Sequence, residues 1–460
     1  MKKTVLFLLS IVTVLLAFSA CDSGSLIRPA DSLLTPPIYY DEYEGLVEVF
    51  RSSVGSDATF CNPFSGNYRS AITVADVDGD GNNEAVIFYK KKSASDINNQ
   101  LIKMHYFDYL DGEWVSAGEV DGHGDGVESF SFTDMNGDGF SEIFVSWSTS
   151  SVSSGSYISL YRFDLSSLIF TEVFGENCLA HLLIDVDGDL LDDIFYINQS
   201  VVMDVGQKNA RVIGLSGDSV VIHGESKLDP NISRYTLTVP EKHADNGVLS
   251  VYIDALKGEH QMITEFLYWD SEKSELCNPL LNVDTMSNTK TFRYESISSE
   301  DINGDGKIDI PAQTPLVQTG PETNENEIAL ANEIGESVYL TTWKNFSFDA
   351  SETIVAYTLV NVNDGYMIYL SEEETQTISI TAYPDRNCWV VYKRDSVTGE
   401  SEEIYSVLRI KNGSTEETLN GQYIPVIEKD DETVYVYITE NGRANGIDEK
   451  TVREKITKIP

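Results

Sequence analysis

Four short segments of this 460-residue chain repeat one pattern of oxygen-bearing side chains. Counted from its first aspartate, each segment has an acidic or amide side chain at positions 1, 3, 5 and 9, and glycine at position 4. Alternate residues of a tight turn can point their oxygens inward, as a hard cation such as Ca²⁺ requires. We call them loop 1 (Asp76, Asp78, Asp80, Glu84), loop 2 (Asp134, Asn136, Asp138, Glu142), loop 3 (Asp185, Asp187, Asp189, Asp193) and loop 4 (Asp301, Asn303, Asp305, Asp309).

The four loops predict three to four bound Ca²⁺ ions, because a simple hairpin turn needs neither this alternation nor a fourth oxygen at position 9. Loop 3 departs from the others at position 6, where Leu190 replaces glycine. We expect this leucine to resist the turn that glycine allows, so that loop 3 binds least tightly or least regularly. The predicted ligand set also includes the residues at position 7, which are Asn82, Phe140, Leu191 and Lys307.

The loops differ from those of an EF-hand, which has a bidentate Glu at position 12 and a helix on each side. Position 12 is occupied here by Ile87, Val145, Tyr196 and Ala312. Runs of β-branched and aromatic residues flank the loops instead, and such runs predict strands. They cover residues 72–75, 85–89, 130–133, 143–147 and 194–197. Each unit is therefore predicted to be a strand, a cation loop and a second strand.

The loops begin at residues 76, 134, 185 and 301, so the last spacing is about twice the first two. One unit without a cation loop should lie in this gap, where residues 251–258 and 262–269 predict two strands and a tight turn. Further strands at 101–107 and 157–163 bring each unit to about four strands. Repeats of about fifty residues with several strands each are typical of propeller blades.

The loops and their flanking strands resemble FG-GAP/VCBS repeats, the blades of the integrin-α-type β-propeller, whose Ca²⁺ loop has the pattern Asp-x-Asp-Gly-Asp-Gly-x-x-Asp. Residues 34–37, 65–70 and 301–311 are also similar to uncharacterised VCBS repeat-containing lipoproteins of Firmicutes. The resemblance covers residues 59–320. It implies a calcium-binding propeller and leaves the biological role open, because propellers host many functions.

The first twenty residues predict a signal peptide, with Lys2 and Lys3 before an apolar core. The segment that ends at Ala20-Cys21 is similar to a bacterial lipobox, in which Cys21 is lipidated after cleavage. Ordinary secretion with a free Cys21 is the alternative. We expect residues 21–37 to be a lipidated tether that holds the protein on the extracellular face of the bacterial cell membrane, with no contact to the membrane except the lipid anchor.

Three further segments complete the predicted organisation. Residues 38–58 should form a helix that packs on the first blade, because apolar residues recur there at helical spacing. Residues 59–362 should form a β-propeller of five to seven blades, and residues 363–460 a smaller C-terminal α+β domain whose strands could instead supply extra blades. A strand is expected at 353–362, before this domain. The strands of the domain are expected at 366–370, 377–383, 388–393, 405–410, 423–427 and 434–438, and its closing helix at 448–456. The fold class is mainly β.

Composition narrows the list of partners. The formal net charge of −42 argues against nucleic acid and against docking on anionic lipid. Besides Cys21 there are four widely spaced cysteines, for which buried free thiols are favoured over the disulfides that secretion permits. The six histidines show no metal-ligand spacing along the chain, so zinc is not indicated.

Two classes of function remain. No nucleophile elbow, phosphate loop or dinucleotide fingerprint is present, and no Cys–His pair is legible in the sequence. This absence favours a non-catalytic, Ca²⁺-stabilised surface module that binds an extracellular protein or glycan. The alternative is a secreted polysaccharide-active enzyme, a lyase or glycosidase, on a propeller scaffold.

Overall fold

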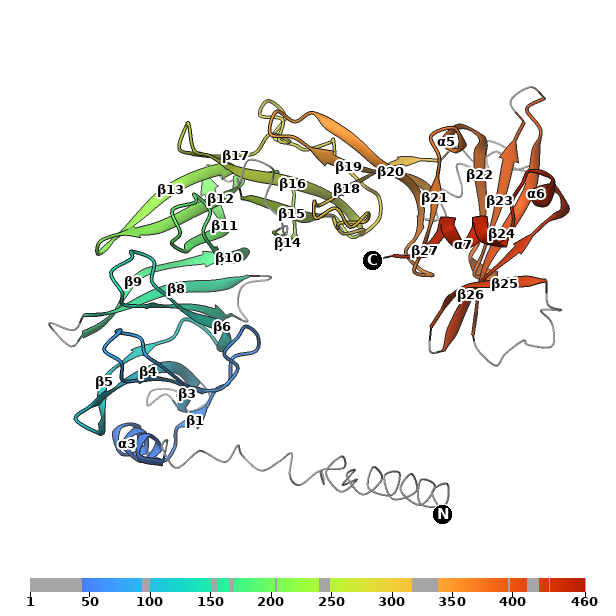
Figure 1. Ribbon diagram of the computed structural model, residues 1–460. Helices are drawn as coiled ribbons and strands as arrows, with labels where there is room; N and C mark the ends of the chain where they lie inside the picture. The colour runs from blue at the N-terminus through green and yellow to red at the C-terminus, as the bar shows by residue number, and fades with distance from the viewer. Residues whose placement is uncertain are drawn as a thin grey trace, which may run out of the picture.

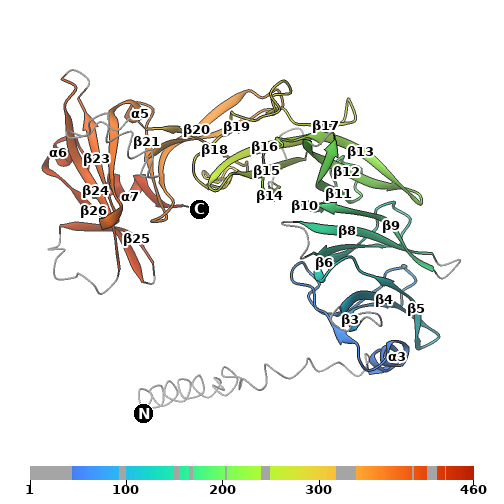
Figure 2. The same cartoon turned by 180° about the vertical axis from the view of Figure 1, so that it is seen from behind.

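The computed structural model describes residues 44–92, 100–149, 155–164, 169–202, 205–239, 249–316, 338–395, 398–411, 422–429 and 431–459. The predicted signal peptide, the tether and Cys21 lie outside these residues. The fold is mainly β, with six antiparallel sheets that follow one another along an open arc (Figures 1 and 2). No helix in the described ranges is long and apolar enough to cross a membrane.

Sheets 1 to 4 are built from strands that are consecutive in the chain. Sheet 1 contains β1 (Thr59–Phe60), β2 (Ile72–Ala75), β3 (Glu84–Lys92), β4 (Gln100–Leu110) and β5 (Glu113–Asp121). Sheet 2 contains β6 (Gly126–Thr133), β7 (Glu142–Ser148), β8 (Ser156–Asp164) and β9 (Ile169–Cys178). Sheet 3 contains β10 (Ala180–Ile184), β11 (Asp193–Val202), β12 (Val205–Ser216) and β13 (Ser219–Lys227). Sheet 4 contains β14 (Arg234–Thr238), β15 (Ser250–Lys257), β16 (Gln261–Asp270) and β17 (Glu275–Cys277).

Sheet 4 is the unit without a cation loop that the double spacing predicts, since β15 and β16 cover the two expected strands. The strands predicted beside loops 1 to 3 are also confirmed. These runs form strands because β-branched and aromatic side chains fit a pleated surface that is packed on its faces.

Sheets 5 and 6 hold the C-terminal strands. Sheet 5 contains β18 (Ile310–Pro315), β19 (Tyr339–Phe346), β20 (Glu352–Asn361), β21 (Tyr366–Leu370) and the last strand, β27 (Ile456–Lys458). Sheet 6 contains β22 (Ile378–Tyr383), β23 (Cys388–Arg394), β24 (Ser401–Lys411), β25 (Tyr423–Glu428) and β26 (Glu432–Ile438). Helices α5 (Glu374–Thr377), α6 (Glu440–Ala444) and α7 (Glu449–Lys455), with the short η2 (Pro384–Arg386), accompany them.

The expected domain boundary between residues 362 and 363 falls in the turn that joins β20 to β21. These two strands are hydrogen bonded to each other, and β27 returns from the C-terminus to pair with β21. Leu359 and Ile368 of sheet 5 share one hydrophobic core with Val407 and Val436 of sheet 6. Hydrogen bonds and apolar packing are therefore continuous across the expected boundary.

Neighbouring sheets pack face to face through shared apolar cores. Phe88 of sheet 1 meets Trp147 of sheet 2, with ring centroids 5.9 Å apart. Similar cores join sheet 2 to sheet 3, sheet 3 to sheet 4 and sheet 4 to sheet 5. The central strands are consequently buried on both sides, and residues 84–89 of β3 are all buried.

Helix α3 (Glu44–Val54) covers the outer face of sheet 1, where Phe50 packs against Ala85 and Tyr89. The predicted N-terminal helix is therefore confirmed for residues 44–54. In a closed propeller this face would pack against the last blade. Here α3 occupies it, and Figure 1 shows sheets 1 and 6 at opposite ends of the arc. The described residues form an open stack of sheets, and no closure into a propeller is seen among them.

Candidate metal sites

All four loops close with the same pairing. In each, the residue at position 9 pairs with the residue just before position 1. It is the first residue of the following strand in loops 1 to 3, and in loop 4 it directly precedes β18. The pairs are Ala75 with Glu84, Thr133 with Glu142, Ile184 with Asp193 and Glu300 with Asp309. This register fixes the length of the loop and turns the position-9 side chain toward the other loop residues.

The loops also share one backbone turn. At position 6, Gly81, Gly139 and Gly306 have φ angles of 89°, 90° and 84°, in the left-handed region. Leu190 adopts the same conformation, with φ 75°, and its side chain is 90% exposed. Leu190 therefore adopts the turn that glycine adopts in the other loops, with its side chain in solvent. The left-handed conformation still strains a residue that has a Cβ.

The carboxylate at position 1 holds the turn together in three loops. Asp301 accepts hydrogen bonds from the backbone N–H groups of Gly304 and Gly306, each 2.7 Å long. Asp134 accepts from Gly137 and Gly139, and Asp185 from Gly188 and Leu190. In loop 1 the side chain of Asp76 is exposed, and its oxygen lies within 4.8 Å of oxygens of Asp78 and Glu84.

The carboxylate at position 9 is buried in every loop, and it is partly unsatisfied in two of them. One oxygen of Glu84 accepts the backbone N–H of Val77 at 2.6 Å, and one oxygen of Glu142 accepts that of Met135 at 2.9 Å. The second oxygen of each is buried without a hydrogen-bond partner, and the residues are only 1% and 0% exposed. A buried oxygen without a hydrogen-bond partner costs free energy, and a cation bound beside it would lower that cost. In loop 2 this oxygen, Oε1 of Glu142, lies 3.7 Å from Nε of Arg162.

The protonation behaviour of these carboxylates points the same way. Burial raises the pKa of Glu84 to about 7, and the nearby carboxylate of Asp78 adds to the rise. Burial likewise raises the pKa of Asp193 and of Asp309 to about 6, with further contributions from the aspartates of their own loops. Closely spaced carboxylates in a dry site repel one another, and a bound cation would relieve that repulsion.

The residue opposite position 9 on the next strand was not found by reasoning from the sequence. The strand pairing ends one residue short of position 9, and its register places one residue of the next strand opposite that position. The resulting pairs are Glu84 with Asp108, Glu142 with Arg162, Asp193 with Gly214 and Asp309 with Asn345. This position therefore differs chemically in every loop: a carboxylate in loop 1, a guanidinium in loop 2, no side chain in loop 3 and an amide in loop 4.

These residues change what each loop can hold. In loop 1, Asp108 is 5% exposed and adds a buried carboxylate. In loop 2, Nη2 of Arg162 lies 2.5 Å from Oδ2 of Asp138, and its Nε lies 3.7 Å from Oε1 of Glu142. In loop 4, the Asn345 amide donates to Asp309 and to the carbonyl of Ile308.

At position 7 the predicted ligand atom can be a backbone carbonyl oxygen in every loop, but a side-chain oxygen only where the residue has one. Phe140 and Leu191 have no side-chain oxygen, so only their carbonyls can bind a cation, as position 7 of an EF-hand does. The side chain of Lys307 is exposed. The Asn82 amide donates to Asp80 at 3.0 Å.

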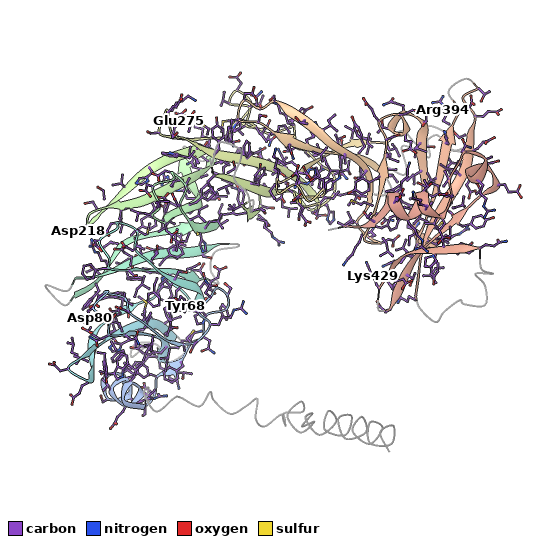
Figure 3. All side chains as sticks on the ribbon, viewed as in Figure 1. Tyr68, Asp80, Asp218, Glu275, Arg394 and Lys429 are labelled. Atoms are coloured by element: carbon purple, nitrogen blue, oxygen red, sulfur yellow. The ribbon has the colours of Figure 1, made fainter. Side chains whose placement is uncertain are left out.

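Loops 1, 2 and 3 contact one another along one edge of the stack. The backbone N–H of Ser141 in loop 2 donates to the carbonyl of Val77 in loop 1 at 2.7 Å. The Thr133 hydroxyl, just before loop 2, donates to Asp192 in loop 3 at 2.8 Å. Figure 3 shows Asp80 and Asp218, the ion-pair partner of Arg162, on this same side. The acidic loops therefore form one continuous edge.

A groove of about 460 Å³ lies at the opposite ends of the same strands. Its lining comes from the segment between β1 and β2, from strands of sheets 2 and 4, and from residues beside those strands. It includes Phe64, Glu128, Leu179, Arg234 and Tyr235. Phe64 is 67% exposed. Glu128 accepts hydrogen bonds from the hydroxyls of Ser146 and Ser156. The groove thus combines an exposed aromatic ring, an arginine and a fixed carboxylate.

One Cys–His pair appears that the sequence did not reveal. Sγ of Cys178 lies 3.8 Å from Nδ1 of His181. Burial raises the pKa of the Cys178 thiol to about 12 and lowers the pKa of His181. A nucleophilic pair needs the thiolate, so this buried pair has the properties of core residues. Cys61, Cys178 and Cys388 are buried free thiols, as expected, while Cys277 is partly exposed and also free.

No protein-family model matches the chain, and no curated protein matches its sequence. Two solved structures show distant likeness. The Sqt1 protein of Saccharomyces cerevisiae is 10% identical, covers 77% of this chain and 92% of its own, and has a TM-score of 0.27. Rhamnogalacturonan lyase PL11 of Bacillus licheniformis is 12% identical, covers 83% and 91%, and has a TM-score of 0.29. Likenesses of this size say nothing about the function of this chain.

Proposed function

We propose that this chain is a non-catalytic binding module stabilised by Ca²⁺, whose blade-like sheets are FG-GAP/VCBS-type repeats and whose loops hold three to four ions. The observation that carries the proposal is the position-9 carboxylate of loops 1 and 2. It is buried, it accepts one loop amide, and its other oxygen has no hydrogen-bond partner. Oxygen atoms crowded in this way are what Ca²⁺ binds.

The bound ion would act on stability. Loops 1 to 3 each join two paired strands of one sheet, and the ends of loop 4 are joined by a single β-bridge. An ion held by positions 1, 3, 5 and 9 would link both ends of the loop and neutralise its carboxylates. A ligand that binds only the folded state stabilises that state by mass action. Loop 1 is the strongest candidate, because Asp108 adds a fifth carboxylate near Glu84.

The groove is the proposed ligand site. Phe64 offers an exposed aromatic ring beside the buried Tyr235, while Arg234 and Glu128 offer polar contacts for an extracellular glycan or protein. Most glycosidases need two carboxyl groups across the bond they cleave. Among the described residues that line this groove, Glu128 is the only carboxylate. The lining therefore favours binding over hydrolysis.

The location is proposed from the sequence. The signal peptide and Cys21 support a lipid anchor on the extracellular face of the cell membrane, with the groove available to a ligand outside the cell.

Calorimetry of the purified chain in EDTA and in millimolar Ca²⁺ tests the proposal, together with a count of bound ions by equilibrium dialysis. We expect three to four Ca²⁺ per chain and a higher melting temperature when they are bound. An unchanged melting temperature would contradict the stabilising role. A glycan array with and without Ca²⁺, run beside an assay for reducing-end release, separates a binding module from an enzyme.

A further inference from the structure

Loop 3 contains a nitrogen ligand that the other loops lack. His223 of β13 extends across the sheet toward the loop, where its Nδ1 lies 3.2 Å from Oδ2 of Asp187 and 3.4 Å from Oδ1 of Asp193. Asp193 is 3% exposed. One ligand atom from each of the three residues lies within 4.8 Å of the others. No comparable group with a histidine occurs elsewhere in the described ranges.

Two further observations show that this arrangement is built for an occupant. The Nδ1 atom of His223 is buried and has no hydrogen-bond partner, although it points toward two carboxylates. The position opposite Asp193 is Gly214, where a Cβ would lie 2.7 Å from Cε1 of His223 and 3.0 Å from Oδ1 of Asp193. A larger residue at 214 would collide with the imidazole ring of His223 and with Asp193, so the glycine leaves room for both side chains.

We infer that loop 3 is a site for a borderline transition-metal ion such as Zn²⁺, held by Asp187, Asp193 and Nδ1 of His223. Imidazole is a preferred ligand of Zn²⁺, whereas Ca²⁺ takes oxygen ligands. Two ligand atoms of a tetrahedral zinc, with bonds of about 2.0–2.1 Å, lie about 3.3 Å apart. The observed separations of 3.2 and 3.4 Å match that spacing. The inference rests on the proposal that the loops bind cations, and it changes the ion expected at one of them.

The competing explanation is an ion pair, in which a protonated His223 neutralises Asp187 and Asp193 and no metal binds. Binding measurements separate the two. The full chain is titrated with Zn²⁺ in millimolar Ca²⁺, which fills the oxygen-only loops, and bound zinc is counted by dialysis. We expect one zinc per chain. Co²⁺ in place of Zn²⁺ should give the intense visible absorption of a four-coordinate ion, a readout that needs no variant.

Variants then assign the site. His223→Gln should weaken zinc binding by more than the roughly 10- to 100-fold typical of an outer-shell partner, and Gly214→Ala should weaken it while leaving the histidine in place. His123→Gln is the matched control. Nε2 of His123 also contacts a carboxylate, that of Glu172 at 2.6 Å, but His123 belongs to none of the four acidic loops. Asp80→Ala in loop 1 should reduce calcium binding and leave zinc binding unchanged.

Each outcome decides a different proposal. Zinc binding that is absent in the wild type, or equal in the wild type and His223→Gln, overturns the inference and leaves the calcium proposal intact. If zinc binding depends on His223 and the chain binds no Ca²⁺, the result supports this zinc site and contradicts the calcium proposal for the other loops. Circular dichroism spectra and melting curves for each variant show whether a loss of zinc reflects a loss of fold.

Discussion

Arg162 of β8 lies against Glu142 of β7 and acts as an internal counter-ion of loop 2. The guanidinium contacts both Asp138 and Glu142, which occupy positions 5 and 9 of the cation pattern. The same residue also pairs with Asp218 of the neighbouring sheet. Loop 2 therefore has a built-in positive charge that loop 1 lacks, and a bound Ca²⁺ must compete with it.

Replacing Arg162 should make loop 2 more dependent on calcium. In EDTA we expect Arg162→Gln to lower the free energy of unfolding by roughly 1–3 kcal/mol, because Glu142 loses its charged neighbour. In millimolar Ca²⁺ much of this loss should be recovered. The matched control is Arg211→Gln, which removes ion pairs with Glu176 and Glu225 that lie outside the loops. Its loss should be equal in both buffers. Equal calcium effects on the two variants would contradict the counter-ion role.

Replacing Leu190 should relieve strain. Leu190 has a φ of 75° and is exposed, so Leu190→Gly keeps the turn and loses almost no packing. We expect a gain in stability of about 1 kcal/mol, measured by urea unfolding. The reciprocal change, Gly81→Ala in loop 1, places a Cβ at φ 89° with open space around it and should lose a similar amount. A destabilised Leu190→Gly chain would show that this turn is not strained.

The apo chain should become less stable as pH rises from about 4.5 to about 7. The pKa of Glu84 rises from 4.5 to about 7 on folding, and the pKa values of Asp193 and Asp309 rise to about 6. In this window the folded chain therefore binds more protons than the unfolded chain, so the free energy of unfolding falls with pH. Ca²⁺ needs the ionised carboxylates, so its stabilising effect should grow over the same range.

Melting curves from pH 4.5 to 8 in EDTA and in Ca²⁺ test this dependence. Burial also raises the pKa values of Glu265 and Glu295 to about 7, and neither belongs to a cation loop. Their contribution is common to both buffers, so the difference between the two curves isolates the loops. Glu84→Gln should reduce that difference near pH 7. A difference that is independent of pH would argue against calcium at these carboxylates.

Loop 1 should contribute more calcium-dependent stability than loop 3. Both loops have carboxylates at all four ligand positions, but only loop 1 has a further carboxylate nearby, that of Asp108. Asp80→Ala should therefore lower the melting temperature in Ca²⁺ more than Asp189→Ala does. The same two variants compared in EDTA give the control, since the difference should shrink when no ion is bound. Equal or reversed losses in Ca²⁺ would contradict the ranking.

The lipid anchor predicts a change of location. Cys21→Ser removes the residue that would carry the lipid, and stable anchoring needs two acyl chains. The variant should therefore be released into the medium, or its precursor should remain uncleaved. Cell fractionation and the mass of the mature chain measure both effects. Cys61→Ser, which alters a buried free thiol, is the control and should leave the protein on the membrane. A Cys21→Ser chain that is processed and membrane-bound like the wild type would contradict the anchor.

Much of the local structure follows from the sequence. The oxygen ligands of each loop lie within nine consecutive residues, so one tight turn brings them together wherever the chain folds. The alternating and β-branched runs gave the strands beside the loops, the unit without a loop and most C-terminal strands. Helix α3 followed from the spacing of apolar residues such as Leu46 and Phe50.

Other features depend on contacts between segments that are distant in the chain. Asp108, Arg162 and Asn345 reach the loops because of strand register. Their separation along the chain from position 9 differs from loop to loop, so no fixed spacing in the sequence identifies them. His223 has no metal-ligand spacing in the sequence, yet pairing of β12 with β13 brings it to Asp187 and Asp193. The cover that α3 gives the outer face of sheet 1 is likewise a contact between separate segments. The sequence determined which turns can hold a cation, since those ligands are local. Only the tertiary structure decided which charge or nitrogen completes each turn, because the completing residue comes from another strand.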